Sequence, residues 1–286
     1  MSENKQGLIS QDDDSIQFGN ELAVLPIRNA VLFPGDVAPF DVGREQSVAL
    51  VEDLDQLPSP FIGVFAQRDA STENPGKTDL HEVGCVARVL KALKHSSGSY
   101  SLILRGVARV RLGEVTQSAP YMKARVDRLD ELSVDDDETQ ALTMSLRDVA
   151  KQVLALMREP PREAASLIES TQAPGALADL VAANLEAPVD EKASLLNTLD
   201  VKDRIRKVLK LLSRQLEVLK MRERINLQIK EEMGKNQREY VLRQQMKAIK
   251  DELGEEDGDQ GDLDGFEDRV ARPGCPPRQM PSPRNS

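Results

Sequence analysis

The segment closest to a chemical motif is STENPGKT, residues 71–78, which has some features of a phosphate-binding loop. Such a loop follows the pattern Gly-x-x-x-x-Gly-Lys-Ser/Thr, and its backbone N–H groups and lysine hold a nucleotide phosphate. Here Ser71 stands where the first glycine is required, Pro75 lies inside the loop, and no apolar strand leads directly into it. We therefore interpret residues 71–78 as a surface turn and expect no cofactor on this chain.

Residues suited to nucleophilic catalysis or metal binding are sparse. No serine lies in a setting that pairs it with a lysine base. His81 and His95 are fourteen residues apart and lack cysteine or carboxylate ligands at metal spacing, so we interpret both as surface residues. Two cysteines, Cys85 and Cys275, are too few for a disulfide framework. We expect Cys85 to be a small buried residue of a strand and Cys275 to be exposed and without a function. The sequence predicts no catalytic residue and no metal site.

Composition limits the class of protein. The chain has 286 residues, enough for two modest domains, and its aromatic content of 3% requires largely aliphatic cores. A net charge of -10 argues against a protein that coats nucleic acid along its whole length. The chain has no apolar run of about 18 residues, and its polar N-terminus lacks the apolar core of a signal peptide. We expect a cytoplasmic protein without a membrane partner.

The residue pattern of the first half of the chain is typical of a β domain. Residues 1–18 are charged and predicted to be disordered. Residues 19–132 contain short apolar runs interrupted by proline and glycine, which favours strands and turns. Partial alternation of apolar and polar residues indicates half-buried antiparallel strands. The pattern predicts a mainly β domain, closed or half-closed into a barrel. The expected strands are 61–67, 83–94, 100–112 and 121–132, with one helix at 44–54 and a hairpin turn at 95–99.

In the second half of the chain, the apolar residues recur at the spacing of an α-helix. A helical bundle is predicted for residues 137–200; it begins within the acidic segment 134–140, where carboxylates suit the start of a helix. The first helix carries a predicted apolar stripe of Leu142, Leu146, Val149, Val153, Leu156 and Met157. Shorter helices are expected at 162–169, 175–185 and 190–199. We therefore predict an α+β multidomain protein.

One long helix is predicted over residues 201–253, because this segment has no proline and Gly234 is its one glycine. Its apolar stripe is narrow and thins between Leu219 and Tyr240. The second half therefore requires a partner, either another copy or a further part of the protein. Candidate contacts of this arm are Met233, Arg238, Tyr240 and Met246.

Several motifs in order resemble the N-terminal region of Lon proteases. They begin with LAVLPIRNAVLFPGDVAPFDVGREQSVALVE and continue with VFAQRDA, DLHEVGCVARVLKALK and APYMKARVD. MGKNQREYVLRQQMKAIKDELGE is similar to the helical arm that precedes the family's ATPase module. The resemblance covers about residues 19–256. It implies a pseudobarrel similar to PUA folds, then a helical bundle and a long exposed helix.

The resemblance also implies a function. The family couples an ATPase that uses ATP and Mg to a Ser/Lys protease, and its N-terminal region captures unfolded or misfolded proteins and supports a hexamer. Those catalytic modules lie beyond the matching segments, so we expect neither ATPase nor peptidase activity from this chain alone. Candidate substrate-binding residues are Phe33, Pro34 and Phe40, because unfolded segments offer apolar side chains. The alternative for Phe33 and Phe40 is that both fill the barrel core.

The sequence is also compatible with two other functions. A stand-alone adaptor built from the same domain would bind proteins without proteolysis. A nucleic-acid-binding protein would use residues 201–250, where fifteen Lys/Arg less six Asp/Glu give +9. That segment lacks interleaved stacking aromatics, which favours a solvated helix face.

The last residues depart from the resemblance. Residues 254–286 are an acidic linker followed by a proline-rich tail, and both are expected to be disordered. We interpret the final fifteen or so residues as a product of a frame shift or premature truncation. A genuine disordered tail would have a similar composition.

Overall fold

The computed structural model describes residues 18–54, 60–160 and 163–253. The chain divides into two compact units, one up to Glu223 and one from Arg224 onward. The tail and linker predictions for residues 1–17 and 254–286 lie outside the described residues, as does Cys275. The predicted division into 19–132, 137–200 and 201–253 stays a prediction.

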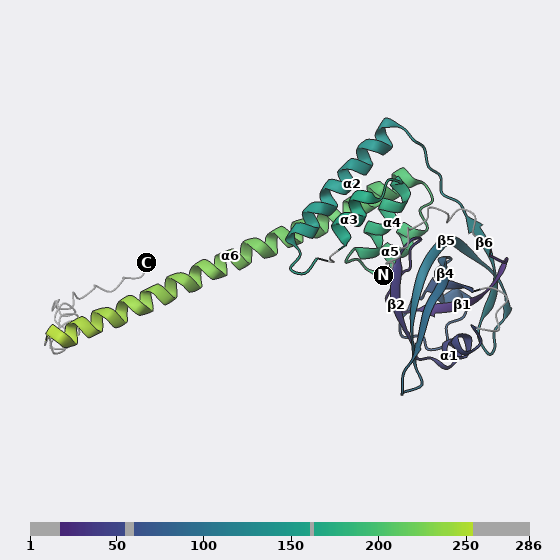
Figure 1. Ribbon diagram of the computed structural model, residues 1–286, viewed down its shortest axis with the longest axis horizontal. Coiled ribbons are helices and arrows are strands. Elements are labelled where there is room, and N and C mark those ends of the chain that lie inside the picture. The colour runs from purple at the N-terminus through teal and green to yellow at the C-terminus, as the bar shows by residue number, and fades with distance from the viewer. Residues whose placement is uncertain (1–17, 55–59, 161–162, 254–286) are drawn as a thin grey trace, which may run out of the picture. The chain divides into compact units, whose positions relative to one another are not determined.

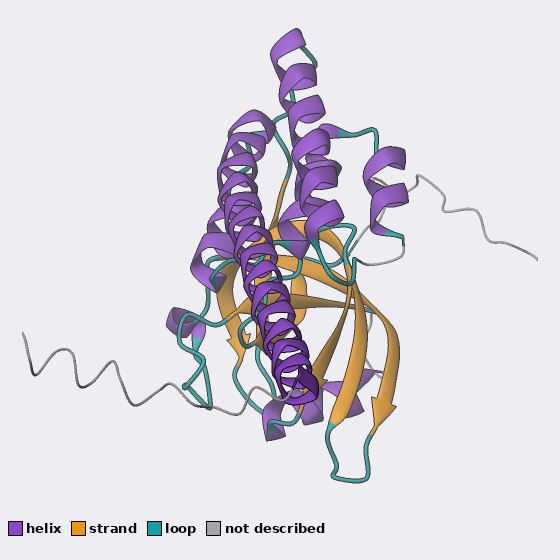
Figure 2. Cartoon of the chain, turned by 90° about the vertical axis from the view of Figure 1, so that its left-hand side faces the viewer, coloured by secondary structure: helices purple, strands orange, loops and turns teal. Residues whose placement is uncertain are grey.

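The strands of the first unit form one mixed sheet (Figure 1). The strand order is β2-β5-β4-β3-β1-β6, and β5 also pairs with β6, so five of the strands close into a ring. Only β1 and β3 run parallel; the other pairs are antiparallel. The expected α+β architecture with an N-terminal pseudobarrel is confirmed (Figure 2). The strands are β1 (Glu21–Ile27), β2 (Val37–Val42), β3 (Phe61–Ala66), β4 (Val83–Lys94), β5 (Tyr100–Gln117) and β6 (Lys123–Leu129).

The eighteen-residue strand β5 organises the barrel. Its first part, Tyr100 to Arg105, pairs with β2, and its second part, from Arg109, pairs with β6. Strand β4 follows β5 along most of its length, across the expected hairpin turn at 95–99. β5 extends beyond the predicted end at residue 112, because β6 continues to pair with it as far as Gln117.

The Phe33-Pro34-Gly35 turn docks against β5. Gly35 N donates to Gly106 O at 3.0 Å, and Gly106 N donates to Asp36 O at 2.9 Å. A Cβ at position 106 would lie 2.0 Å from the carbonyl oxygen of Phe33, so this approach requires glycine. The Phe33 side chain is fully buried in the core.

Helices form the rest of the first unit. They are α1 (Glu45–Glu52), the 3-10 turn η3 (Lys77–Asp79), α2 (Asp137–Leu156), α3 (Ala164–Ser170), α4 (Pro174–Asn184), α5 (Val189–Leu196) and the start of α6 (Val201–Leu253). One apolar cluster contains side chains from the strands and from α2, α4, α5 and α6. A second cluster, which includes Val24, Phe65 and Val110, is drawn mainly from strands. The two faces of β1 are therefore both buried.

Helix α2 begins as predicted, and all six residues of its predicted apolar stripe are buried in the first apolar cluster or packed against it. The Asp136 side chain accepts from Thr139 N at 2.9 Å, as an N-cap residue does. The residues buried on α2 include Thr139 and Thr143 with Leu146, whereas Leu142 is only half-buried. Both threonine hydroxyls donate to main-chain carbonyls, at 2.8 and 2.6 Å, which removes the cost of burying them.

Four charged side chains connect the barrel to the helices. Arg109 of β5 donates to Asp179 of α4 at 2.5 Å and to Glu131 at 2.7 Å, and its Nε donates to Leu196 O at 2.9 Å. Arg204 of α6 lies 2.9 Å from Glu131 and 3.4 Å from Asp179. Burial raises the pKa of the Asp179 carboxyl, and the two guanidiniums oppose that shift. We call these four residues the charge cluster.

Helix α6 is continuous from Val201 to Leu253, as expected. Its buried residues in the first unit include Ile205, Val208 and Leu212, and the last of them is Leu216. In the second unit every helix residue whose side chain is described is exposed. In the described parts of the chain, no helix has the length and apolar character needed to cross a membrane.

Replacing Phe33 with alanine should lower the free energy of unfolding by about 3–5 kcal/mol, because it leaves a cavity in a core that already surrounds the ring. Urea unfolding of the whole chain measures this, and Phe40→Ala, at a half-buried position, should cost less. A loss below about 1 kcal/mol for Phe33→Ala would contradict the burial.

Removing the Asp179 carboxylate charge with Asp179→Asn should lower the free energy of unfolding by about 3–5 kcal/mol, because two buried guanidiniums would keep Glu131 as their one carboxylate in the charge cluster. Asp148→Asn, at an exposed position on α2, is the matched control and should change little. Equal effects of the two substitutions in urea unfolding would disprove the role of the cluster.

Asp136→Asn should lower stability at neutral pH, and that loss should shrink in acid. The hydrogen bond from Lys202, followed by those from Thr139, lowers the pKa of Asp136 to about 2. Because the folded-state pKa is depressed, the stabilisation is present above the ordinary value and is lost as the pH falls toward 2. Urea unfolding at pH 7 and pH 3 should show the gap between wild type and variant narrowing. Because the folded-state pKa is about 2, part of the gap remains at pH 3. A gap as large at pH 3 as at pH 7, or one undiminished in a Lys202→Met background, would count against this pair.

Candidate functional site

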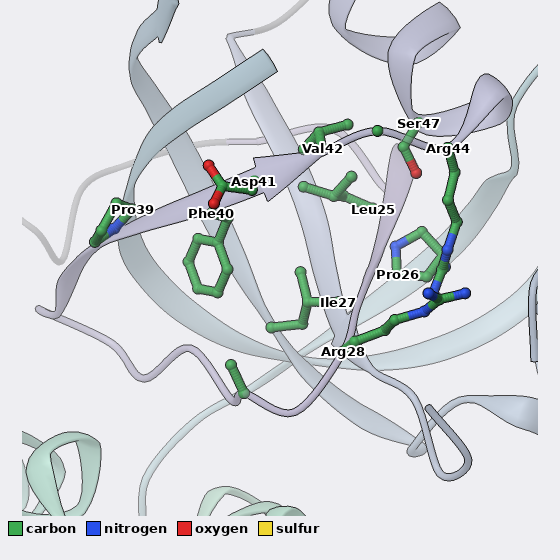
Figure 3. A pocket seen from close by; sticks show the side chains of 12 residues that line it. Leu25, Pro26, Ile27, Arg28, Pro39, Phe40, Asp41, Val42, Arg44 and Ser47 are labelled. Carbon is green, nitrogen blue, oxygen red and sulfur yellow. The ribbon is translucent and has the colours of Figure 1, made fainter. Parts of the chain in front are cut away.

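A pocket of about 570 Å³ opens on the barrel between β1, β2 and the start of α1 (Figure 3). Its position follows from the topology, because β2 leaves the Phe33 turn and α1 begins three residues after β2 ends. The lining residues are Leu25, Pro26, Ile27, Arg28, Ala30, Pro39, Phe40, Asp41, Val42, Gly43, Arg44 and Ser47.

One wall of the pocket is apolar. Leu25 and Ile27 alternate with Pro26 along β1, and the ring of Phe40 on β2 points toward Ile27 (Figure 3). Phe40 is half-buried, so part of its ring stays accessible. Such a wall suits an apolar side chain of a ligand.

The opposite end of the pocket carries two arginines, Arg28 and Arg44. Arg44 precedes α1, and its Nη2 donates to the side-chain oxygen of Gln67. Gln67 is buried, and its Nε2 donates to Thr72 O at 3.0 Å, where Arg28 Nη2 also donates at 3.3 Å. Burial and then the charge of Arg28 lower the pKa of Arg44, whereas Glu73 opposes the shift.

Exposed apolar side chains lie on the strands next to the pocket. Val37 on β2 and Leu90 and Leu93 on β4 are between 43% and 52% exposed. Both strands flank the first part of β5. Side chains alternate between faces along β2, so Val37 lies on the opposite face from Phe40. Leu93 lies on that opposite face too, because it is paired with Ser101, the partner of Asp41.

The structure separates the candidate substrate-binding residues. Phe40 lines the pocket, but Phe33 is fully buried and Pro34 is half-buried in the turn. Phe33 therefore fills the core, which is the alternative that the sequence left open, and its full burial does not agree with a substrate contact. The sequence did not single out Arg28 or Arg44, although both stand in the motifs that carry the family resemblance.

The candidate arm residues Met233, Arg238, Tyr240 and Met246 are all exposed on α6 within the second unit. At about 100° per residue, Met233 and Tyr240 share one face of the helix, whereas Met246 lies on a roughly opposite face. Tyr240 accepts a hydrogen bond from Gln244 Nε2 at 2.9 Å. Their role as contacts stays a prediction.

The histidines and Cys85 have distinct environments. The prediction that His81 is a surface residue is wrong, because its side chain is 13% exposed and lies 3.3 Å from Asp190. His95 is exposed and hydrogen-bonds to Ser101. Cys85 is fully buried, and burial raises the pKa of its thiol to about 12. Within the described residues, no three His, Cys, Asp or Glu side chains gather as a metal site requires.

Residues 71–78 do not fit a nucleotide phosphate. Gly76 N donates to the Asp79 carboxylate at 2.8 Å, and Ser71 N donates to the Asp69 carboxylate at 2.8 Å. The N–H groups that a phosphate would need are therefore bound to carboxylates, whose charge repels it.

The fold and the pocket define a binding domain built from a barrel and a helical bundle. The family model of the ATP-dependent protease La (LON) substrate-binding domain matches residues 21–214, so the chain belongs to that family. The chain is 46% identical over 275 residues to Lon protease 2 of Myxococcus xanthus, covering 95% of this chain and 32% of that protein. It is also 46% identical over 257 residues to a Lon protease of Anaeromyxobacter dehalogenans, covering 90% and 30% respectively.

A solved structure supports the same fold. The N-terminal domain of Mycobacterium avium complex Lon protease aligns with a TM-score of 0.56 and 22% identity, covering 68% of this chain and 98% of that one. The chain spans about a third of the length of the curated relatives above. The resemblance inferred from the motifs is confirmed.

Proposed function

We propose that this chain binds unfolded protein segments as the N-terminal substrate-recognition part of a Lon-type ATP-dependent protease. The observation that carries the proposal is the accessible apolar pocket around Phe40, on a domain whose family is described as substrate-binding. Unfolded segments present apolar side chains that a folded protein buries, and a pocket of this kind accepts them without a fixed sequence.

The chemistry of degradation belongs, in this proposal, to the rest of the protease. ATP and Mg would bind to an ATPase module, since residues 71–78 do not fit a phosphate, and a Ser/Lys peptidase module would cut the client. The chain alone is therefore expected to hydrolyse neither ATP nor peptides. We place the protein in the cytoplasm, with misfolded proteins as its clients.

The second unit is proposed to hold copies of the protein together, as in a hexamer. Its support is the set of exposed apolar residues on α6, which includes Met233 and Tyr240 on one face and Met246 on another. The basic charge of residues 201–250 suits acidic partner surfaces better than nucleic acid, because Tyr240 is the one aromatic residue in the segment.

The binding proposal predicts that Phe40→Ala weakens binding of a permanently unfolded client. A labelled, reduced and carboxymethylated protein, titrated with the whole chain, should bind roughly tenfold more weakly to the variant, because a buried aromatic contact is lost. Fluorescence anisotropy measures the dissociation constant.

Met144→Ala is the matched control, since Met144 is an exposed apolar residue on α2 outside the pocket. It should leave the dissociation constant within about twofold, which is under 0.5 kcal/mol. Unchanged binding by Phe40→Ala, in a variant that unfolds at the same urea concentration as wild type, would exclude the pocket as the binding site.

A further inference from the structure

We propose that Arg28 and Arg44 form a carboxylate-binding subsite at the polar end of the pocket. Its ligand is a peptide segment in which an apolar side chain stands next to a carboxylate group. The inference rests on the proposed function, because it assigns a chemical class to the segments that enter the same pocket.

The two guanidinium groups are brought together by one buried amide. Gln67 accepts from Arg44 Nη2, and the Gln67 Nε2 donates to Thr72 O at 3.0 Å. The same carbonyl accepts from Arg28 Nη2 at 3.3 Å. The side chains of Arg28 and Arg44 consequently lie beside each other at the pocket (Figure 3). Like charges held together in this way are stabilised when an anion binds between them.

The arginines have unused hydrogen-bonding capacity. Arg44 Nη1 is buried and has no hydrogen-bond partner within the residues that the structure describes. Among those residues, no carboxylate lies within 4.0 Å of a guanidinium nitrogen of Arg28 or Arg44, since neither arginine takes part in an ion pair. A buried donor without a partner is costly, so a ligand that accepts its hydrogen gains that energy on binding.

Two carboxylates of the chain are near this subsite. Asp41 lines the pocket but accepts a hydrogen bond from the Ser101 hydroxyl. Glu73 opposes the lowered pKa of Arg44 without forming an ion pair with it. Their negative charges disfavour a polyanion, whereas one carboxylate fits the paired donors of a guanidinium.

The apolar wall sets the second requirement. Leu25, Ile27 and Phe40 lie in the same pocket as the arginines, so a carboxylate on Arg28 or Arg44 places the neighbouring side chain of its peptide toward them (Figure 3). The carboxylate has two sources in an unfolded protein: the C-terminus of the chain, or an Asp or Glu side chain.

Fluorescein-labelled peptides with a common Leu-Phe core test the subsite on the whole chain. One pair ends in a free carboxylate or in an amide. A second pair has an amide end and carries Glu or Gln beside the Phe. We expect the free carboxylate or the Glu peptide to bind roughly tenfold more tightly than its neutral counterpart, as for a charge-assisted hydrogen bond. The pair that shows the preference identifies the source.

Arg28→Gln and Arg44→Gln should abolish that preference while leaving the neutral peptides within about twofold. Arg28 is the decisive position if Arg44→Gln fails to fold, because Arg28 is exposed and its side chain donates to one carbonyl oxygen, that of Thr72. Arg125→Gln removes the same charge at a side chain that is 70% exposed on β6, and it should retain the preference.

Four results would overturn the inference, and the last of them would also remove the proposed function. Equal affinity for charged and neutral peptides leaves the proposed function standing and removes the subsite. An unchanged preference in Arg28→Gln places the carboxylate elsewhere. Competition by inorganic phosphate as strong as that by the carboxylate peptide shows a general anion site. Failure of every peptide and of the unfolded client to bind would remove the proposed function and the inference together.

Discussion

The charge cluster fixes how the barrel and the helices of the first unit meet. Arg109 reaches from β5 to α4 and to the carbonyl that ends α5, and Arg204 joins the same carboxylates from α6. Buried ion pairs add little net stability, but breaking one leaves an uncompensated charge. We infer that the cluster selects one packing of helices on the barrel. Gly175 belongs to this arrangement, because a Cβ there would lie 2.2 Å from the Glu131 carboxylate.

The pocket also depends on β5, but on its first part, whereas Arg109 lies in the second part. The first part of β5 carries β2 and, through Gly106, the turn that contains Phe33. That turn determines where β2 begins, and β2 supplies Phe40 to the pocket. The strand that lines the pocket with Phe40 is therefore positioned by a turn whose own aromatic residue, Phe33, is fully buried.

Local patterns predicted the elements well, and long-range contacts explain what they missed. Alternation along residues 83–94 and the absence of proline after Val201 identified β4 and α6, because these signals are local. The inside or outside position of Phe33 depends on Gly106, more than seventy residues away. Arg28 and Arg44 are brought together through Gln67 and the Thr72 carbonyl, which lie after β3, far along the chain from both. Of the three substrate-binding candidates from the sequence, Phe40 is the one that lines the pocket, and its role stays a prediction.

Strand β2 has a further property, which concerns its outer edge. It is the one described strand that pairs with a single neighbour, so its outer edge has unpaired backbone groups. Such an edge is a template on which another extended chain can add and from which aggregates grow. Pro39 stands in the middle of β2 and has no N–H to offer. The strand that carries Phe40 is thus protected from pairing with another extended chain into a growing sheet.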